Sequence, residues 1–264
     1  MTGFVRRLCR KLSNPGRIVL LFRNWPYVLL VYLGLQKKTD FICTLRNGTR
    51  FRVHSVGDPI MICNMWSRKA WTPPGFEIQP GYTVVDVGAY IGAFSIYAAT
   101  RASGVRVVSY EPDPKNFAVL VENVRLNDLE NVEPVLAAVA GRPERRKLFI
   151  NPEGQQSSLM QPVSNSISQP AEDVNCTTLT EVVKHVGKCD LLKMNCEGAE
   201  YEIILNTSEE NLKKVGRIVM DCHDIHGYSV RDLKSHLERA GFEVRVVERW
   251  RQPHVYLHAV LRTS

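Results

Sequence analysis

The chain has 264 residues, of which 44% are hydrophobic and 23% are charged. This composition is typical of a globular protein with a substantial buried core, and it excludes a disordered or fibrous chain. The net charge of +7 is uneven: residues 1–50 contain ten Lys or Arg and one acid, Asp40, which leaves 24 bases and 26 acids for the remainder. A nearly neutral main domain argues against a nucleic-acid partner, which would need a basic face.

Residues 1–38 form a basic and apolar segment, for which we expect a helical arm. Its apolar part, residues 18–35, is interrupted by Arg23, Asn24 and Pro26. It is therefore a poor bilayer span, and it lacks the small-residue cleavage site of a signal peptide. Two placements stay open. The arm makes peripheral contact with an anionic membrane surface, or it packs across the domain with its charges in solvent.

The cysteine pattern bears on metal sites and on location. The seven cysteines include no C-x-x-C pair and no cysteine–histidine spacing typical of zinc. We expect reduced thiols and no metal site. The expected location is the cytoplasm, with peripheral attachment at the inner face of the membrane if the arm binds lipid.

Two regions follow the arm: an extension over residues 39–79 and a main domain over residues 80–264. In the extension, residues 40–53 alternate apolar and polar side chains around Asn47-Gly48, a pattern that predicts a β-hairpin. In the main domain, apolar strands alternate with helical patterns. The predicted strands are 83–87, 105–110, 132–139, 189–194, 217–222, 242–248 and 254–262, and the predicted helices are 91–101, 115–127, 178–186, 197–205 and 229–240.

This alternation predicts an α/β fold with a parallel sheet covered by helices on both faces. The last two strands have no helix between them, which predicts an antiparallel hairpin at one edge of the sheet. Residues 151–170 are low in charge and rich in Ser, Gln, Asn and Pro. We expect a long loop there, either functional or disordered.

The stretch VVDVGAYIGAFSIYAA, residues 84–99, predicts a nucleoside site. A buried strand reaches Asp86, and Gly88 and Gly92 then form a turn before a helix. Glycines let the backbone approach a ligand, and the start of the helix offers free N–H groups. Glu111 ends the next strand, where an acid accepts hydrogen bonds from a ribose diol. The alternative is a tight strand–helix turn with a solvated acid.

A second polar corner lies in LLKMNCEGAEYEIIL, residues 191–205. Asn195, Glu197 and Glu200 follow an apolar strand, and they are either active-site groups or the cap and first turn of a helix. His223, at the end of another predicted strand, titrates near neutrality and is a candidate base. The alternative for His223 is an exposed position in a loop. Because ligands bind outside the carboxyl ends of parallel strands, we expect Asn195, Glu197 and His223 to face an acceptor.

These motifs together resemble the FkbM family of class I S-adenosylmethionine-dependent methyltransferases. The resemblance covers roughly residues 80–225 and rests on VVDVGAYIGAFS, VVSYEPDPKNFAVLVENVRLND and TTLTEVVKHVGKCDLLKMNCEGAEYEIIL in that order. It implies a Rossmann-like, seven-stranded, mostly parallel sheet with one antiparallel edge strand. It also implies S-adenosyl-L-methionine as cofactor and O-methylation of a sugar, glycolipid or related natural product.

The resemblance and the strand-end positions together give the expected site residues. The residues expected at the cofactor are Asp86, Gly88, Ala89, Tyr90, Gly92 and Glu111. Those expected to be catalytic are Glu197, His223 and Asn195, of which His223 rests on its strand-end position and not on the resemblance. Lys193, Glu197, Gly198 and Glu200 match the later family signature. Two residues depart from the family pattern. Tyr90 stands where the family often has Asn, and Asn195 stands where it usually has Asp, which weakens the case for a Mg²⁺ clamp.

Three functions are compatible with these features. The first is an O-methyltransferase whose acceptor is a small molecule, a glycan or a lipid-linked sugar, held near the membrane by residues 1–38. The second is an RNA or protein methyltransferase, against which the nearly neutral charge after residue 50 argues. The third is a non-catalytic S-adenosylmethionine-binding module, for which Asn195 is the supporting feature.

Overall fold

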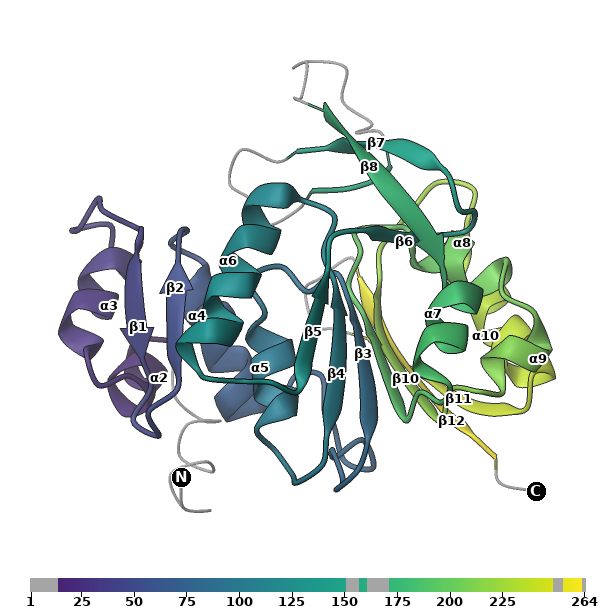
Figure 1. Cartoon of the computed structure of the whole chain (residues 1–264), viewed down its shortest axis with the longest axis horizontal. Helices are drawn as coiled ribbons and strands as arrows, with labels where there is room; N and C mark the ends of the chain where they lie inside the picture. Colours follow the sequence, from purple (N-terminus) through teal and green to yellow (C-terminus); the bar gives the residue numbers. More distant parts are fainter. Residues whose placement is uncertain (1–13, 151–156, 161–170, 249–253, 263–264) are drawn as a thin grey trace.

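The computed structural model describes residues 14–150, 157–160, 171–248 and 254–262 (Figure 1). Its centre is a seven-stranded sheet in the order β11-β12-β10-β9-β3-β4-β5. The strands are β3 (Thr83–Val87), β4 (Arg106–Tyr110), β5 (Val132–Val135), β9 (Leu191–Met194), β10 (Arg217–Cys222), β11 (Phe242–Glu248) and β12 (Val255–Leu261). Five neighbouring strands, from β10 to β5, are parallel, and β12 is antiparallel to both of its neighbours.

The predicted α/β class, the seven strands and the reversed last strand are confirmed. One detail was wrong, because the antiparallel strand does not lie at the edge. The chain runs along the edge as β11 and returns as β12, which pairs with β10 on one side and with β11 on the other. The second strand of the hairpin, β12, is therefore the second strand from the edge, and β11 is the edge strand.

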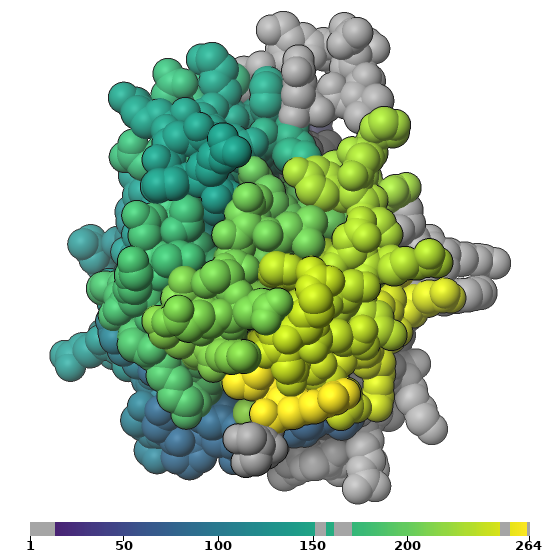
Figure 2. Space-filling model, turned by 90° about the vertical axis from the view of Figure 1, so that its right-hand side faces the viewer, coloured from purple at the N-terminus to yellow at the C-terminus, as the bar shows by residue number. Residues whose placement is uncertain are grey.

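Helices cover both faces of this sheet, and each face has its own apolar core (Figure 1). Successive strand residues point to opposite faces, so Val84 belongs to one core and Val85 to the other. The helices on the Val84 face are α5 (Ala93–Ala99) and α6 (Pro114–Leu126). Those on the Val85 face are α7 (Leu179–Val186), α8 (Glu200–Leu205), α9 (Glu209–Leu212) and α10 (Val230–Arg239). Figure 2 shows this second face, covered by the C-terminal half of the chain.

A smaller sheet of three strands lies beside the carboxyl end of β5. It is made of β6 (Ala138–Ala140), β7 (Arg145–Phe149) and β8 (Ala171–Thr178), in the order β6-β8-β7. The predicted single strand 132–139 is in fact two strands, because β5 ends at Val135 and β6 begins at Ala138. Most of the predicted loop 151–170 lies outside the described residues. Ser158, which is described, pairs with Phe149 through two backbone hydrogen bonds.

The N-terminal part packs on the Val84 face rather than standing apart. It contains α2 (Asn14–Leu21), α3 (Trp25–Tyr32), β1 (Phe41–Thr44), β2 (Arg50–Val53), α4 (Asp58–Cys63) and the π-helix η1 (Asn64–Arg68). The predicted hairpin is confirmed by the antiparallel pairing of β1 with β2. Ile18, Leu21 and Phe22 are buried in the same core as Val84. The predicted boundaries at residues 38 and 79 stay predictions, since this core packs across both.

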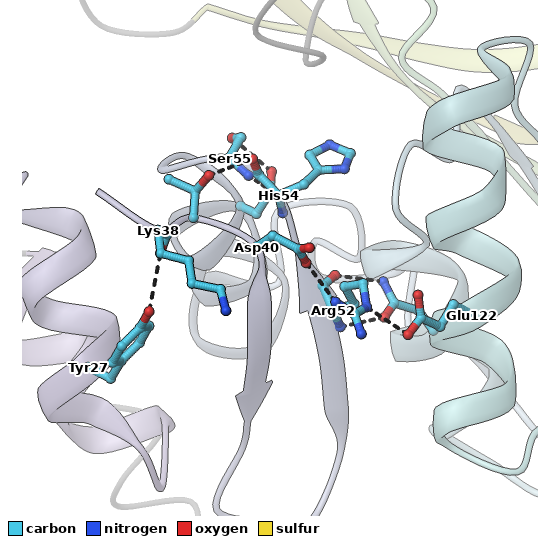
Figure 3. A network of polar contacts seen from close by, with 10 residues as sticks. Tyr27, Lys38, Asp40, Arg52, His54, Ser55 and Glu122 are labelled. Atoms are coloured by element: carbon cyan, nitrogen blue, oxygen red, sulfur yellow. Dashed lines mark hydrogen bonds and ion pairs between the residues drawn. The ribbon is translucent and has the colours of Figure 1, made fainter. Parts of the chain in front are cut away.

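Side-chain contacts tie the hairpin to the main domain. The Arg52 guanidinium lies 2.7 Å from an Asp40 carboxylate oxygen and 2.7 Å from one of Glu122 on α6 (Figure 3). The Asn123 side chain accepts from the Arg52 backbone N–H at 2.6 Å and donates to the Ile91 carbonyl at 2.9 Å. The extension is therefore fixed to the start of α5 and to α6. No helix in the described residues is long and apolar enough to cross a bilayer.

Candidate active site

Two cavities meet at the carboxyl ends of β3 and β9, where the fold rule places ligands. We call them the Glu111 cavity and the Trp71 cavity. The Glu111 cavity has a volume of about 60 Å³ and is also lined by Pro112, Val139 and Leu159. The Trp71 cavity is larger, with a volume of about 600 Å³. Four residues line both cavities, namely Gly88, Tyr90, Asn195 and Glu197. They mark the place where two ligands would meet.

Gly88 lets the loop after β3 approach the loop after β9. Its φ is +74°, and a Cβ built there would lie 2.0 Å from the Asn195 carbonyl oxygen. No other residue type fits both the left-handed conformation and this contact. The Gly88 and Ala89 N–H groups both donate to the Tyr110 carbonyl at 3.0 Å. The glycine turn is therefore held against β4 and β9 together.

Asp86 and Lys193 form a buried ion pair beneath the turn. The Lys193 Nζ lies 2.8 Å from an Asp86 carboxylate oxygen and donates to the Gly88 carbonyl at 2.7 Å. Ser95 Oγ donates to the other Asp86 oxygen at 2.6 Å. Asp86 has no exposed surface and lines neither cavity. Its position is that of a residue that shapes the turn, and its predicted contact with the cofactor stays a prediction.

Glu111 presents a carboxylate at the end of β4, inside the Glu111 cavity. One of its oxygens accepts from the Tyr90 N–H at 2.7 Å and the other from the Asp113 N–H at 3.0 Å. Burial raises the pKa of this carboxyl to about 7, against the lowering effect of these two backbone donors. Each carboxylate oxygen can accept a further hydrogen bond. Glu111 therefore presents free acceptor capacity to a cavity that has apolar walls formed by Pro112, Val139 and Leu159.

Tyr90 connects the two cavities to the extension. Its hydroxyl donates to Asp58 at 2.9 Å and lies 2.8 Å from the His54 Nε2. Its φ is +54°, and that of Glu197 is +52°. Non-glycine residues rarely adopt this conformation, and such strained residues cluster at functional sites. Both strained residues lie where the two cavities join.

The corner between β9 and α8 is ordered by Glu200. Its buried carboxylate accepts from the Cys196 N–H at 2.8 Å and from the Gly198 N–H at 2.9 Å. The expectation that Asn195 caps the following helix was wrong, because α8 begins at Glu200 and its N-terminal cap position, Ala199, has no side-chain cap. The helix predicted over residues 197–205 therefore begins at Glu200, three residues later than predicted. Within the described residues the Asn195 side-chain amide has no hydrogen-bond partner, and Asn195 lines both cavities.

His223 lies between two carboxylates. Its Nε2 is 3.2 Å from Glu197 and its Nδ1 is 3.2 Å from Glu200. Burial lowers the pKa of the imidazole, but the hydrogen bonds and charges of Glu197 and Glu200 outweigh burial and raise the pKa to about 10. His223 is therefore a cation at neutral pH. His223 lines neither cavity, and its imidazole contacts the Glu197 carboxylate, which does line them.

The Trp71 cavity has an apolar part and a polar end. Ile60, Met61, Met65 and Trp71 form part of its wall. Its polar end is formed by Lys193, Asn195, Glu197 and Asp221, next to the Glu111 cavity. A ligand here meets carboxylates, an amide and the Lys193 ammonium group at one end, and mostly apolar side chains with Asn64 among them along the rest. Such an arrangement suits an amphiphilic molecule with its polar group turned toward β9.

The structure thus distributes the predicted residues unevenly. Gly88, Tyr90 and Glu111 line the Glu111 cavity, whereas Ala89 lines only the Trp71 cavity. Gly92, like Asp86, lines neither. Its φ is +82°, and a Cβ there would lie 2.5 Å from a Leu120 methyl group, so it lets α6 pack on the start of α5.

Several residues of the site were not predicted. Lys193 matched the family signature but was given no role, and Asp221 was not among the predicted site residues. Trp71 and the other extension residues were not assigned to the site. A buried lysine in the middle of an apolar strand, as in LLKM, was the available signal for Lys193. The extension gave no comparable signal, because apolar wall residues have no pattern distinct from core residues.

Comparison with known proteins agrees with this geometry. Residues 86–244 match the Methyltransferase FkbM domain. The chain is 24% identical over 239 residues to the 31-O-demethyl-FK506 methyltransferase FkbM of Streptomyces tacrolimicus, which covers 78% of this chain and 91% of that protein. It is 26% identical to Methyltransferase sdnD of Sordaria araneosa, over 61% of this chain and 73% of that protein. Its match to the AMB antimetabolite synthetase AmbE of Pseudomonas aeruginosa is 25% identical and spans 67% of this chain but only 10% of that protein.

Among solved structures, fibrillarin of Aeropyrum pernix in complex with natively bound S-adenosyl-L-methionine superposes with a TM-score of 0.48 and 14% identity, over 87% of this chain and 86% of that one. The precorrin-6y C5,15-methyltransferase of Geobacter metallireducens gives 0.47 and 18%, over 74% and 87%. The family match, by contrast, covers more than half of the chain and includes both cavity-forming strand ends. The chain therefore belongs to the FkbM family of S-adenosylmethionine-dependent methyltransferases.

Proposed function

We propose that the chain transfers a methyl group from S-adenosylmethionine to a hydroxyl oxygen of a sugar, a glycolipid or a related natural product. The observation that carries this proposal is the junction of the Glu111 cavity with the Trp71 cavity at Gly88, Tyr90, Asn195 and Glu197. The relative from Streptomyces tacrolimicus is named as an O-demethyl-FK506 methyltransferase, which supports a hydroxyl acceptor on a natural product.

The Glu111 cavity would hold the cofactor. Glu111 would accept hydrogen bonds from the ribose hydroxyls, and Pro112, Val139 and Leu159 would contact the base. When bound, S-adenosylmethionine supplies an electrophilic methyl group, and much of the rate of such a transfer comes from holding the acceptor close and in line. Tyr90 and Glu197, held in strained conformations, would set that alignment.

The polar end of the Trp71 cavity would hold the acceptor hydroxyl. Asn195 offers an amide that is unpaired in the described structure, and Glu197 and Asp221 offer carboxylates. A hydroxyl is a poor nucleophile until its proton is removed, so a carboxylate within hydrogen-bond reach would assist. His223 was predicted as a candidate base. Because it already carries a proton between Glu197 and Glu200, we assign it a positioning role and give proton removal to a carboxylate.

The experiment incubates the purified chain with S-adenosylmethionine carrying an isotopically labelled methyl group and with lipid and aqueous extracts of cells lacking the gene. Label should enter a product heavier by one methylene, and it should resist mild base, as an ether does and a methyl ester does not. Label on nitrogen or on a carboxyl group would contradict the proposal. So would cofactor binding without transfer into any fraction.

The Asn195→Asp variant refines this result, because the resemblance to the FkbM family leads us to expect Asp at this position. Higher turnover in the variant would mean that the neutral amide is a tolerated loss. Lower turnover with unchanged cofactor affinity would mean that the acceptor requires a neutral hydrogen-bonding group at this position. Gel filtration and thermal melting of both forms serve as the control for folding.

A further inference from the structure

The end of α3 presents large apolar side chains to solvent. Leu30, Leu33 and Leu35 have exposed fractions of 43%, 53% and 72%. We call these three residues the leucine edge. Single exposed leucines are common on protein surfaces, but three within six positions form a patch. The patch therefore calls for a partner.

The leucine edge is held in place by hydrogen bonds. The Leu35 N–H donates to the Leu30 carbonyl at 2.9 Å, and the Gly34 N–H donates to the Val31 carbonyl at 3.0 Å. The Tyr27 hydroxyl donates to the Lys38 carbonyl at 3.3 Å and ties the following segment back to α3 (Figure 3). Val28 and Val31, on the other side of α3, are fully buried. The leucines are thus turned outward by a packed helix and do not belong to a loose end.

The charged residues that precede and directly follow the leucine edge in the sequence are basic. Arg23, Lys37 and Lys38 are exposed, and no acid occurs from residue 14 to residue 39. The first acid, Asp40, is paired with Arg52 at 2.7 Å. The sequence of residues 1–13 adds four bases and no acid. Apolar side chains surrounded by Lys and Arg are complementary to the surface of an anionic bilayer.

The leucine edge also adjoins the mouth of the Trp71 cavity. Tyr32, between Leu30 and Leu33 on the same helix, lines this cavity, as does Val56, which is 54% exposed. The helix that carries Leu30 therefore also contributes to the wall of the cavity that contains Asn195 and Glu197. A molecule with an apolar tail that leaves a bilayer beside this helix would reach the cavity over a short distance.

We propose that the leucine edge docks on an anionic bilayer and that the Trp71 cavity takes an amphiphilic acceptor from that surface. The acceptor would place its hydroxyl at Asn195 and Glu197 and its apolar part along Ile60, Met61 and Trp71. That the amphiphilic molecule accepts a methyl group rests on the proposed function. Docking on the bilayer does not rest on it, because docking involves no residue of the methyl-transfer site.

The first experiment measures flotation of the full chain with vesicles of phosphatidylcholine alone and of equal amounts of phosphatidylcholine and phosphatidylglycerol. The parent should float with the anionic vesicles, and less so in high salt, because charges are screened within about 8 Å at physiological ionic strength. Leu33→Ser/Leu35→Ser should lower the bound fraction at least about tenfold, since two apolar side chains no longer leave water. The matched control is Val246→Ser/Leu136→Ser, which changes two exposed apolar residues outside the arm, with exposed fractions of 38% and 47%.

Three results would overturn the docking: no flotation of the parent, equal binding to neutral and anionic vesicles, or equal loss in both double variants. A dimer seen by gel filtration that only Leu33→Ser/Leu35→Ser dissociates, without flotation of the parent, would assign the leucine edge to a second copy and also overturn it. Isothermal titration with S-adenosylmethionine should give the same affinity for both variants and the parent. Loss of vesicle binding with intact cofactor binding would thus leave the proposed function standing.

The second experiment probes the cavity with octyl glucoside below its micelle concentration and with methyl glucoside, both added to the cofactor-loaded chain. Only octyl glucoside should give measurable heat, and Met61→Glu, at a half-buried wall position, should weaken it at least about tenfold because a charge then faces the apolar tail. Flotation of Met61→Glu should match that of the parent. Equal binding of the two glucosides, or no effect of Met61→Glu, would overturn the amphiphilic acceptor.

Discussion

The Glu111 cavity and the Trp71 cavity meet at four residues, but they are assembled in different ways. Most of the Glu111 cavity comes from the chain between β3 and β7, and its carboxylate is already held by two backbone donors. The Trp71 cavity takes side chains from residues as far apart as Tyr32 and Tyr256. A common ligand can be bound by a compact local unit, whereas a variable ligand is bound by distant segments that can change independently.

The largest test of this comparison is Gly88→Ala, at the contact between the two cavities. The new Cβ would lie 2.0 Å from the Asn195 carbonyl oxygen, so the loops after β3 and β9 must separate. We expect the affinity for S-adenosylmethionine, measured by isothermal titration, to fall at least about 100-fold, or roughly 2.8 kcal/mol. The matched control is Gly187→Ala. Its φ of +76° is similar, but no atom outside its chain neighbours lies within 4 Å of a Cβ built there. Similar small losses in the two variants would show that the contact is unimportant.

Glu111→Ala tests the cofactor side alone. It removes a charged acceptor, a loss worth about 1.5–3 kcal/mol, so the dissociation constant should rise about 10- to 150-fold. The acceptor concentration that gives half-maximal rate at saturating cofactor should change little. In the parent, affinity should also increase as pH rises through about 7, where Glu111 becomes ionised, whereas the variant should be flat. Glu133→Ala, at an exposed carboxylate on β5, is the control.

Glu197→Gln tests the acceptor side of the junction between the two cavities, which Glu197 lines. Turnover should fall at least about tenfold, or roughly 1.4 kcal/mol in the barrier, because the variant loses a charge beside the reacting hydroxyl. Cofactor affinity and melting temperature should change little. The control is Glu209→Gln, which alters a surface carboxylate next to Arg239. Unchanged turnover in Glu197→Gln would mean that the corner only orders the loop, and Asp221 would then be the remaining carboxylate at the acceptor.

A further test concerns stability and pH at His223. Its pKa in the folded chain is raised to about 10 from an ordinary value of 6.5. A raised pKa contributes stability that is fully present below about 6.5 and is lost as pH rises through about 10. Denaturant unfolding should therefore show the parent losing stability across this interval relative to His223→Gln. Parallel stability curves for the two proteins would contradict the buried ion pairs with Glu197 and Glu200.

Local patterns were sufficient to predict the strand, turn and acid around Gly88 and Glu111. The strand 83–87, the turn at Gly88 and the acid at Glu111 are close in sequence, and each has a physical signature of its own: buried β-branched residues, glycine at positive φ, and an acid after a strand. The order of the motifs also predicted the family. Such features depend on neighbouring residues and so can be inferred without tertiary structure.

The remainder depended on contacts between distant residues. Strands β7 and β8 were missed because RRKLF and AEDVNCTT are largely charged or polar, as expected of a small sheet with exposed sides. Nothing in the sequence around His223 indicates that two carboxylates contact its imidazole and keep it protonated. Likewise, the pairing of Asp86 with Lys193, which supports the turn at Gly88, joins residues more than one hundred positions apart.

The position of β12 also has a consequence for the order in which parts of the sheet can form. Because β12 lies between β10 and β11, the seven-stranded sheet cannot be completed until residues 255–261 have been synthesised. Tyr256 of β12 pairs with Asp221 and lines the Trp71 cavity. Gly88 and Glu111, by contrast, follow β3 and β4, which are synthesised well before β12. The wall of the Trp71 cavity can therefore close only after the strands that carry Gly88 and Glu111 have been made.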